Sequence, residues 1–357
     1  MNNTLQDILK AIKKPSVTYH KQAEDYVDGL TKPVGSLGQL EEIYCRLCGI
    51  QQTSQLKLDK KVVIIMCSDN GVCEEGVSEC PQEVTATVAY NFTRGITGIN
   101  RMSAFTHSAI HIVDIGIKDT IQHPLIAQKK VRPSTGNMTK ELAMTREEVL
   151  QAIEVGIEAV KECVEKGYEV FGTGEMGIGN TTTSAAVLSV LLDEEVEQVV
   201  GRGAGAREET FTRKIEAIKK AIGWHQPNKD DIIDTLSKVG GLDLAGLCGV
   251  YIGASYYQKP VVIDGFIAAV AAVCACRLQP LVREYLFPSH LSEEKGMQLA
   301  LKDLRLKAYF DLGMRLGEGT GCPITFGLMD MANSVLTTMG TFEDAHVEKE
   351  NYMNVWK

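Results

Sequence analysis

Short apolar segments that alternate with helical patterns constrain the fold of this chain more than any other feature. Segments of strand length occupy residues 62–66, 108–113, 169–171 and 261–263, and each is followed by a polar or glycine-rich turn and then a helical pattern. Such alternation is typical of parallel β-strands joined by crossover helices. We therefore expect an α/β fold with a doubly wound, mostly parallel sheet.

The two ends of the chain differ from its middle. The first ~55 and the last ~50 residues carry helical patterns without strand-like segments. The whole chain has 357 residues, which corresponds to about two domains at roughly 150 residues each. We predict an α/β domain over residues 60–300 and a small helical domain built from residues 1–59 together with residues 301–357.

Hydroxyl side chains mark several predicted helix starts. Thr145 precedes a helical pattern that begins at Arg146, Thr210 precedes one that contains Ile215, and residues 181–184 precede the apolar run 185–192. Thr and Ser side chains accept hydrogen bonds from the free N–H groups of a first helical turn. We expect a helix to begin directly after each of these positions.

Composition excludes several classes of protein. Apolar residues make up 44% and charged residues 23%, as in a typical globular protein. Lys+Arg 37 against Asp+Glu 46 gives a net charge of −9, so nucleic acid and anionic membrane are not expected partners. No uncharged apolar stretch reaches the about 18 residues of a membrane span. The ten cysteines are scattered and no secretory signal precedes them, which indicates reduced thiols and a cytoplasmic protein.

A glycine-rich segment at residues 171–182 follows one predicted strand and opens a predicted helix. Backbone N–H groups and the positive end of a helix dipole make such a turn a binding site for anions. The letters GTGEMG at residues 172–177 also match the GxGxxG pattern of dinucleotide-binding proteins. That pattern belongs after the first strand of its fold, whereas here it comes late in the strand series. We expect phosphate binding, with a dinucleotide site and a purely structural turn as the alternatives.

Two further glycine clusters stand beside charged residues. Residues 201–205 precede a predicted helix that carries Lys214, and residues 315–321 hold one acid, Glu318, between glycines. Glycine on both sides lets the backbone approach a ligand closely and leaves the carboxylate free to reach it. Because a dry site raises the pKa of a carboxyl group, Glu318 is a candidate general base.

These glycine clusters belong to a collinear series of motifs that extends over nearly the whole chain. The series comprises LTKPVGSLG (30–38), MCSDNGV (66–72), NFTRGITG (91–98), GEMGIGNTT (174–182), SKVGGLD (237–243), DGF (264–266), PSHLSEEKG (288–296) and the segment 314–321. In this order the motifs resemble the nicotinate-nucleotide:dimethylbenzimidazole phosphoribosyltransferases, the family that builds the lower-ligand nucleotide of cobamides.

The resemblance implies a reaction and a set of site residues. Nicotinate mononucleotide and a lower-ligand base would give an α-ribazole 5′-phosphate-type nucleotide and nicotinate. The α/β domain would bind the nucleotide, the helical domain would complete the active site, and the protein would be a homodimer. Glu318 falls at the position of the family's catalytic base. The positions implied to line the nucleotide site are Glu175, Gly177, Asn180, Thr181, Gly203, Lys214 and Ser292.

The implied chemistry agrees with a single acid in the third glycine cluster. Nicotinate in the mononucleotide is a pyridinium, so it leaves as a neutral ring and needs no general acid. Glycosidases, in contrast, use two carboxyl groups. Glu318 would take the proton of the entering base, and the anomeric configuration would invert. The sequence shows no cluster of metal ligands, and we expect neither a metal nor another cofactor.

The sequence departs from the family where the base is bound. Where the resemblance implies a Ser and a Gln, this chain has Cys80 and Val88, and Leu316 is a third residue expected in that pocket. Asn70 also replaces a family His. Loss of the polar partners would suit a base that offers no second nitrogen. The alternatives are a phenol- or p-cresol-accepting subunit of a heterodimer, a non-catalytic structural partner subunit and, from another class, a dinucleotide-dependent oxidoreductase.

Overall fold

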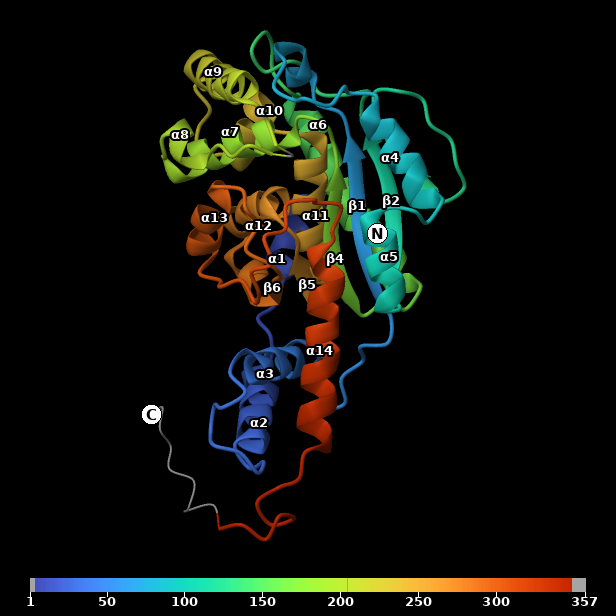
Figure 1. Cartoon of the computed structure of the whole chain (residues 1–357), viewed down its shortest axis with the longest axis vertical. Coiled ribbons are helices and arrows are strands. Elements are labelled where there is room, and N and C mark those ends of the chain that lie inside the picture. The colour runs from blue at the N-terminus through green and yellow to red at the C-terminus, as the bar shows by residue number, and fades with distance from the viewer. Residues whose placement is uncertain (1–3, 204, 349–357) are drawn as a thin grey trace.

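A single parallel sheet forms the centre of the molecule (Figure 1). The computed structural model describes residues 4–203 and 205–348. Six strands within these ranges pair in the order β3-β2-β1-β4-β5-β6, all of them parallel. The strands are β1 (Lys61–Ser68), β2 (Ala109–Gly116), β3 (Ile126–Gln128), β4 (Val170–Met176), β5 (Val261–Ile263) and β6 (Leu286–Pro288).

The sequence of β1 explains its central place. All of its residues are buried, and most are β-branched or otherwise apolar. A strand with this composition fits a sheet that is covered on both faces. β1 pairs with β2 from Val62↔Ala109 and with β4 from Lys61↔Val170. The strand order reverses direction between β1 and β4, and ligands of open α/β sheets bind outside the carboxyl ends of strands at such a point.

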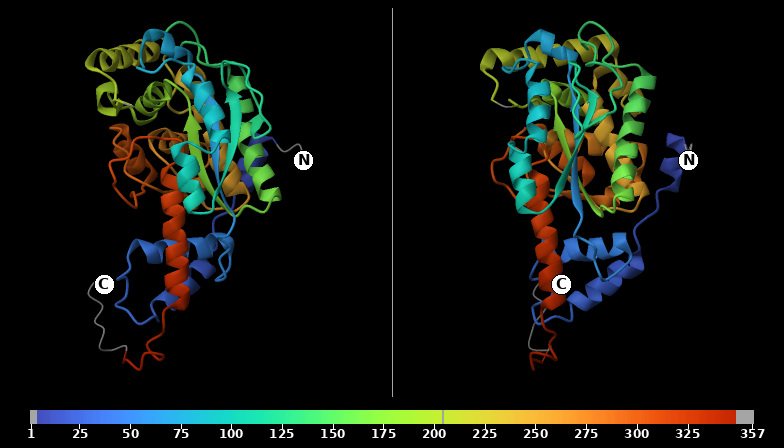
Figure 2. Two further views of the ribbon diagram at one scale, coloured as in Figure 1. Left: turned by 45° about the vertical axis from the view of Figure 1, so that its right-hand side comes forward. Right: turned by 90° about the vertical axis from the view of Figure 1, so that its right-hand side faces the viewer.

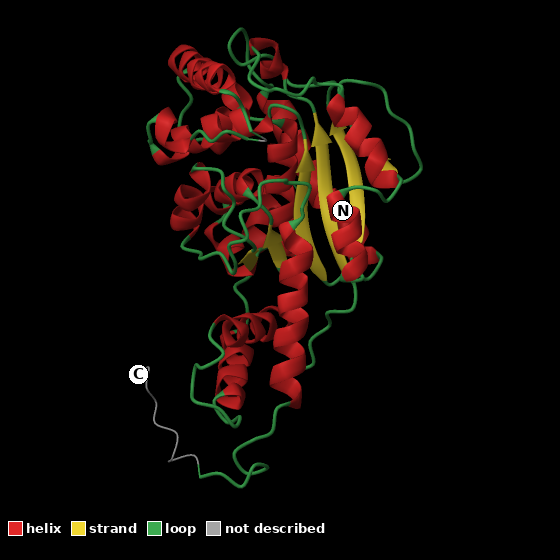
Figure 3. Cartoon of the chain, viewed as in Figure 1, coloured by secondary structure: helices red, strands yellow, loops and turns green. Residues whose placement is uncertain are grey.

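Helices cover both faces of the sheet, as the two rotated views in Figure 2 and the colouring in Figure 3 show. One face carries α4 (Val84–Thr93), α5 (Gly98–Phe105) and α14 (Gly321–Thr338). The other carries α6 (Arg146–Glu165), α11 (Leu242–Tyr256) and α12 (Phe266–Leu278). This arrangement confirms the predicted doubly wound α/β fold.

Further helical elements surround the carboxyl end of the sheet and its β6 edge (Figure 1). Their apolar side chains join the same hydrophobic core. These elements are η1 (Gly71–Glu75), α7 (Asn180–Leu192), α8 (Val196–Val199), α9 (Glu208–His225), α10 (Ile232–Val239), η2 (Pro280–Tyr285) and α13 (Gly296–Leu304).

A helical part extends beyond the amino ends of the strands (Figure 1). It consists of α2 (Val17–Val27), α3 (Gln39–Gln51) and the carboxyl-terminal half of α14. The Tyr26 hydroxyl donates a hydrogen bond to the Leu336 carbonyl at 3.0 Å. In contrast, α1 (Leu5–Ala11) packs against α11 of the sheet region. We therefore keep the two-domain division as a proposal, with α1 assigned to the α/β part; residues 1–3 and 349–357 lie outside the described residues.

The predicted strands and helix starts have mixed outcomes. The four predicted strands correspond to β1, β2, β4 and β5, whereas the three-residue strands β3 and β6 were not predicted. Thr145 caps α6, because its hydroxyl accepts from the Glu148 N–H at 3.1 Å. The other two starts were wrong. α7 begins at Asn180 after Gly179, so residues 181–184 lie inside it, and α9 begins before Thr210.

None of the helices in the described ranges combines the length and the apolar character that a membrane span requires.

Candidate active site

A cavity of about 310 Å³ opens at the carboxyl edge of the sheet. Its walls come from the segments that follow β4, β5 and β6, from α4 and the turn before it, and from residues 315–318. The carboxyl-terminal segment therefore contributes to the cavity through a loop. None of the described residues up to 59 lines it, and α2 and α3 lie beyond the opposite edge of the sheet. Within one chain, the amino-terminal helices do not complete this site.

Close contacts explain the glycines of the loop between β4 and α7. A Cβ on Gly177 would overlap the Ser68 carbonyl oxygen, and a Cβ on Gly174 would lie 2.7 Å from the carbonyl oxygen of Glu318. Gly179 has φ +88°, which favours glycine. The backbone can therefore turn tightly from β4 into α7, which places the amino end of that helix at the cavity.

Glu318 lies at the cavity on a strained loop. Its φ is +60°, and Gly317 and Gly319 on either side have φ +80° and +91°. Left-handed backbone is uncommon for a residue other than glycine. The Glu318 carboxylate accepts a hydrogen bond from the Ile99 N–H at 3.3 Å, at the amino end of α5. Burial raises the pKa of this carboxyl group, whereas the backbone N–H groups of Ile99 and Gly98 oppose that rise.

Three buried carboxyl groups, Glu175, Asp243 and Asp264, form a carboxyl cluster near the Glu318 loop. The Asn180 amide donates to Glu175 and, at 3.0 Å, to Asp243. Burial and then the nearby Asp243 raise the pKa of Glu175 to about 8. Burial also raises the pKa of Asp264 to about 7 and that of Asp243 to about 6. A group of acids in a site of low dielectric attracts positive charge strongly.

A buried lysine stands behind the glycine loop. Lys214 of α9 is 2% exposed, and its ammonium group donates to the Thr181 hydroxyl at 2.9 Å and to the Gly201 carbonyl at 3.4 Å. Burial lowers its pKa. A Cβ on Gly203, which has φ +58°, would lie 3.3 Å from the lysine Nζ. Lys214 therefore touches the loops that form the cavity wall without lining the cavity itself.

The three residues expected to contact the base, Cys80, Val88 and Leu316, line the same cavity. Cys80 is exposed and Val88 is half-buried, so neither is locked in the core. The Leu316 side chain, 61% exposed, approaches Gly98 at the start of α5, where a Cβ would lie 2.8 Å from Leu316 Cδ2. Val88 and Leu316 thus add apolar surface to a cavity that acids also line.

The structure brings nearly all of the predicted site residues together. Glu318, Ser292 and the predicted residues of the glycine loops line the cavity with the three base-pocket residues, and Lys214 lies directly behind Thr181. Sequence reasoning assigned no role to Asp243, Asp264, His290 or Glu294. Asp264 had a readable signal, because it follows the apolar strand segment 261–263 directly. Glu294 lines the cavity, and its Oε2 has no hydrogen-bond partner among the described residues.

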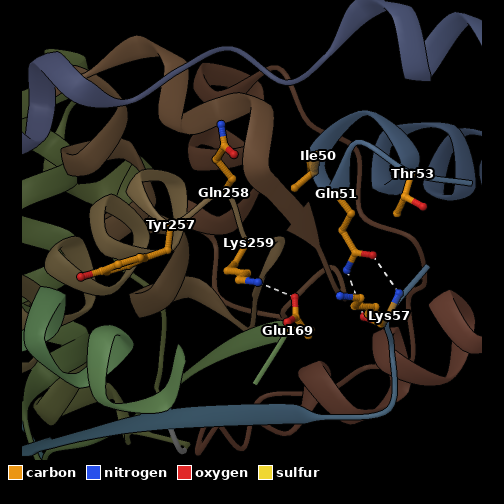
Figure 4. Close-up of a pocket in the computed structure, with 8 residues that line it drawn as sticks. All are labelled: Ile50, Gln51, Thr53, Lys57, Glu169, Tyr257, Gln258 and Lys259. Carbon is orange, nitrogen blue, oxygen red and sulfur yellow. Dashed lines mark hydrogen bonds and ion pairs between the residues drawn. The ribbon is translucent and has the colours of Figure 1, made fainter. Parts of the chain in front are cut away.

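A second cavity, of about 340 Å³, lies at the opposite edge of the sheet (Figure 4). Glu169 precedes β4, Lys259 lies shortly before β5, and the two side chains form an ion pair across this cavity. Gln51 at the end of α3 is held by two hydrogen bonds to the Lys57 backbone, at 3.0 and 2.8 Å. This polar cavity holds none of the predicted site residues.

No group of three or more His, Cys, Asp or Glu side chains is arranged to hold a metal ion in residues 4–203 and 205–348.

Comparison with known proteins identifies relatives along the full chain. The sequence model of a phosphoribosyltransferase family matches residues 12–347. The nicotinate-nucleotide–dimethylbenzimidazole phosphoribosyltransferase of Clostridium tetani is 46% identical, with 98% of this chain and 96% of the relative covered. The enzyme of the same name from Acetivibrio thermocellus is 49% identical, with 97% of each chain covered.

A solved structure agrees with the sequence relatives. The crystal structure of the enzyme of that name from Thermus thermophilus superposes with a TM-score of 0.88 at 36% identity, and the match covers 93% of this chain and 99% of that chain. These similarities confirm the resemblance on which the site residues were predicted. The chain therefore belongs to the nicotinate-nucleotide–dimethylbenzimidazole phosphoribosyltransferase family.

Proposed function

We propose that this chain transfers the 5-phosphoribosyl group of nicotinate mononucleotide to a cobamide lower-ligand base, dimethylbenzimidazole or a relative. The products are an α-ribazole 5′-phosphate-type nucleotide and nicotinate. One observation carries the proposal: Glu318 lines the same cavity as the glycine loop that opens α7. The names of the sequence relatives support the same reaction.

In this proposal the 5′-phosphate binds at the glycine loops. The N–H groups of the turn into α7 and the amino end of that helix attract its negative charge. Ser292 and Gly203 line the same cavity. Lys214 contributes a positive charge through Thr181, with which it is hydrogen-bonded. Fixing the phosphate orients the ribose, so that its anomeric carbon lies between the leaving ring and the entering base.

Bond making and bond breaking then require a single proton acceptor. The C–N bond to nicotinate breaks, and its electron pair neutralises the pyridinium nitrogen. The base nitrogen attacks the anomeric carbon from the opposite face, which inverts the configuration. The proton of that nitrogen passes to the Glu318 carboxylate, whose pKa is raised by burial.

The carboxyl cluster supports the positive charge that the reaction creates. Positive charge spreads from the pyridinium toward the ribose as the C–N bond breaks. Glu175, Asp243 and Asp264 lie buried beside that region. The pyridinium of the bound mononucleotide favours the ionised forms of these carboxyl groups, and their negative charge then stabilises the positive charge that develops.

Two alternatives receive less support. The relatives named here carry the dimethylbenzimidazole name, which favours that base over a phenol or p-cresol. A non-catalytic partner subunit would not need an acid at position 318, and Glu318 lines the cavity.

We also propose that the protein is a cytoplasmic homodimer, with a heterodimer of related subunits as the alternative. All ten cysteines are free thiols in the structure, as expected in a reducing compartment. Light scattering of the purified protein checks the oligomeric state, and fractionation of cells that express it checks the compartment.

The proposed reaction is tested with the purified chain. Incubation with nicotinate mononucleotide and a panel of benzimidazoles, purines and phenols, followed by chromatography and mass spectrometry, should show nicotinate and one new nucleotide in equal amounts. The expected order of bases places dimethylbenzimidazole above phenol. Absence of nicotinate release with every base would overturn the proposal.

A further inference from the structure

Asp264 binds the loop that carries Glu318 from a distant part of the sequence. It follows β5 directly, and its carboxylate accepts hydrogen bonds from the Gly319 N–H at 2.9 Å and from the Gly321 N–H at 2.7 Å. These two N–H groups stand on the carboxyl-terminal side of Glu318. One side chain therefore fixes the backbone that determines where the Glu318 carboxylate points.

This carboxylate is buried beside a neutral ring. Asp264 is 2% exposed, and its ion-pair partner within the described ranges is His290, at 4.0 Å. Burial lowers the pKa of His290 to about 4, so that ring is neutral near pH 7. The charge of Asp264 is instead met by backbone N–H groups at the amino end of α14. Thr320, the residue before that helix, makes no capping bond of its own, so Asp264 acts as the cap.

The loop needs such an anchor because its backbone is strained. Gly317, Glu318 and Gly319 all have positive φ, and a residue other than glycine keeps such a conformation only where its surroundings hold it. There is also little room to shift toward the sheet. A Cβ on Gly321 would overlap the Ser289 hydroxyl oxygen. Ser289 in turn donates to the Asp264 carbonyl at 2.6 Å.

We propose that Asp264 is a positioning residue for the transferase reaction, which holds the loop so that the Glu318 carboxylate faces the entering base. The inference deepens the proposed function and rests on Glu318 as the base. Asp264 does not take the proton itself. Its two carboxylate oxygens are both occupied by N–H groups.

The test substitutions are Asp264→Asn and its combination with Glu318→Gln. An amide oxygen can accept only one of the two bonds, and its NH₂ group faces the other N–H, so the loop loses its anchor. Misplacing a catalytic group by about 1 Å costs up to roughly 100-fold. We expect Asp264→Asn to lower kcat by about 10- to 100-fold and to change KM for nicotinate mononucleotide by less than about 3-fold.

The double substitution separates positioning from other roles. If Asp264 acts through Glu318, Asp264→Asn has little further effect on the slow turnover of Glu318→Gln, because the group it positions is gone. Single-turnover release of nicotinate measures both rates. Equal fold-losses in the wild-type and Glu318→Gln backgrounds would mean that Asp264 acts on the substrate directly, and they would overturn the inference.

Asp114 offers a matched control. It is a fully buried carboxyl group at the end of β2, it accepts the Ile117 N–H at 2.9 Å, and it does not line the cavity. Asp114→Asn should lower the melting temperature but leave kcat within about 2-fold of wild type. An equal fall of kcat in Asp114→Asn would show that Asp264→Asn acts through general destabilisation, and it would also overturn the inference.

A fallback substitution covers the case in which Asp264→Asn does not fold. Should Asp264→Asn not fold, Asp264→Ser, which is smaller and can still accept one bond, is measured against the same criterion of non-additivity with Glu318→Gln. The proposed function fails differently, since wild-type protein without transferase activity would end it. An active wild type with additive losses ends only the role of Asp264.

Discussion

The Glu318 side chain is the most direct target for a single substitution. In Glu318→Gln the amide oxygen can still accept the Ile99 N–H, which the carboxylate accepts at 3.3 Å, so we expect the fold and mononucleotide binding to remain. Turnover should fall by about 100- to 10,000-fold, the usual contribution of a general base. Steady-state nicotinate release measures the fall, and calorimetry of mononucleotide binding is the control. Turnover near wild type would move the base role to Glu175.

Lys214 tests the phosphate side of the cavity. Loss of a charge-assisted contact costs about 1.5–3 kcal/mol, so Lys214→Ala should weaken mononucleotide binding by roughly 10- to 150-fold. Lys219 of the same helix is a matched control, because its ammonium pairs with Glu197 at the surface. Lys219→Ala should leave the affinity unchanged. An equal loss of affinity for the dephosphorylated nucleoside would show that Lys214 does not act on phosphate.

Cys80 and Val88 test the choice of base. A ring nitrogen buried without a donor costs about 1–3 kcal/mol. Cys80→Ser combined with Val88→Gln should therefore shift the ratio of kcat/KM values toward dimethylbenzimidazole over p-cresol by about 10- to 100-fold. The two substitutions are made together because both side chains line one cavity and need not be additive. A ratio that stays unchanged would show that these positions do not contact the base.

The sequence predicted those site residues that carry their own local signal. Glu318 and the glycine loops could be found because an acid between glycines, and glycines at a helix start, are unusual along a chain. The place of Asp264 directly after an apolar strand segment was a signal for the site, but the roles of Asp243 and Asp264 depend on which loops meet at the sheet edge. Lys214 was predicted to line the nucleotide site, but it lies behind Thr181 and outside the cavity. The packing of α9 determines this place, and the sequence does not show that packing.

At the scale of elements, the strength of a pattern decided what could be predicted. β1 and β4 are long, central and buried, and their apolar runs are easily recognised. β3 and β6 have three residues each, too few for periodicity, and β6 ends at a proline. The start of α9 was misplaced because Thr210 resembles a cap, whereas Glu208 and Glu209 already form the first turn.

The close contact between α6 and α11 predicts that a larger side chain at their interface lowers the stability of the protein. A Cβ on Gly156 of α6 would overlap the Gly246 carbonyl oxygen of α11, so the two helix backbones must separate in Gly156→Ala. Overpacking of this kind costs typically about 1–3 kcal/mol, and occasionally more. Urea unfolding should show that loss of stability.

Substitution of Gly223 in α9 should raise stability, in contrast to substitution of Gly156. Gly223 is exposed, and a Cβ there would meet no atom within 4 Å. Gly223→Ala should raise the free energy of unfolding by about 0.5–1 kcal/mol, because alanine loses less backbone entropy in a helix. Similar effects of both substitutions would contradict the close packing of α6 on α11.

At the scale of the whole molecule, the carboxyl cluster predicts how stability depends on pH. Burial raises the pKa of Glu175 to about 8 and that of Asp264 to about 7 in the folded protein. The folded state then binds more protons than the unfolded state between about pH 4 and these values, so stability falls as pH rises through that window. The melting temperature without substrate should be lower at pH 8.5 than at pH 6.5.

Substitution of one acid identifies the source of that slope. Glu175→Gln removes a group that titrates in the window and should flatten the change from pH 6.5 to 8.5. Glu79 is exposed, and its hydrogen bonds to Thr210 and Arg207 lower its pKa, so Glu79→Gln should leave the slope in place. A melting temperature that rises across the window would contradict the protonated cluster.

The pairing of β1 with β4 has a consequence for synthesis on the ribosome. β1 ends at Ser68, and its partner begins at Val170. At about 5–20 residues per second, the roughly 100 residues between them take on the order of 5–20 s to emerge. During that interval one edge of a largely apolar strand has no partner, and such edges pair with other chains. Because α4 and α5 pack on a face of the sheet and leave this edge open, we expect the nascent protein to depend on molecular chaperones until β4 has been made.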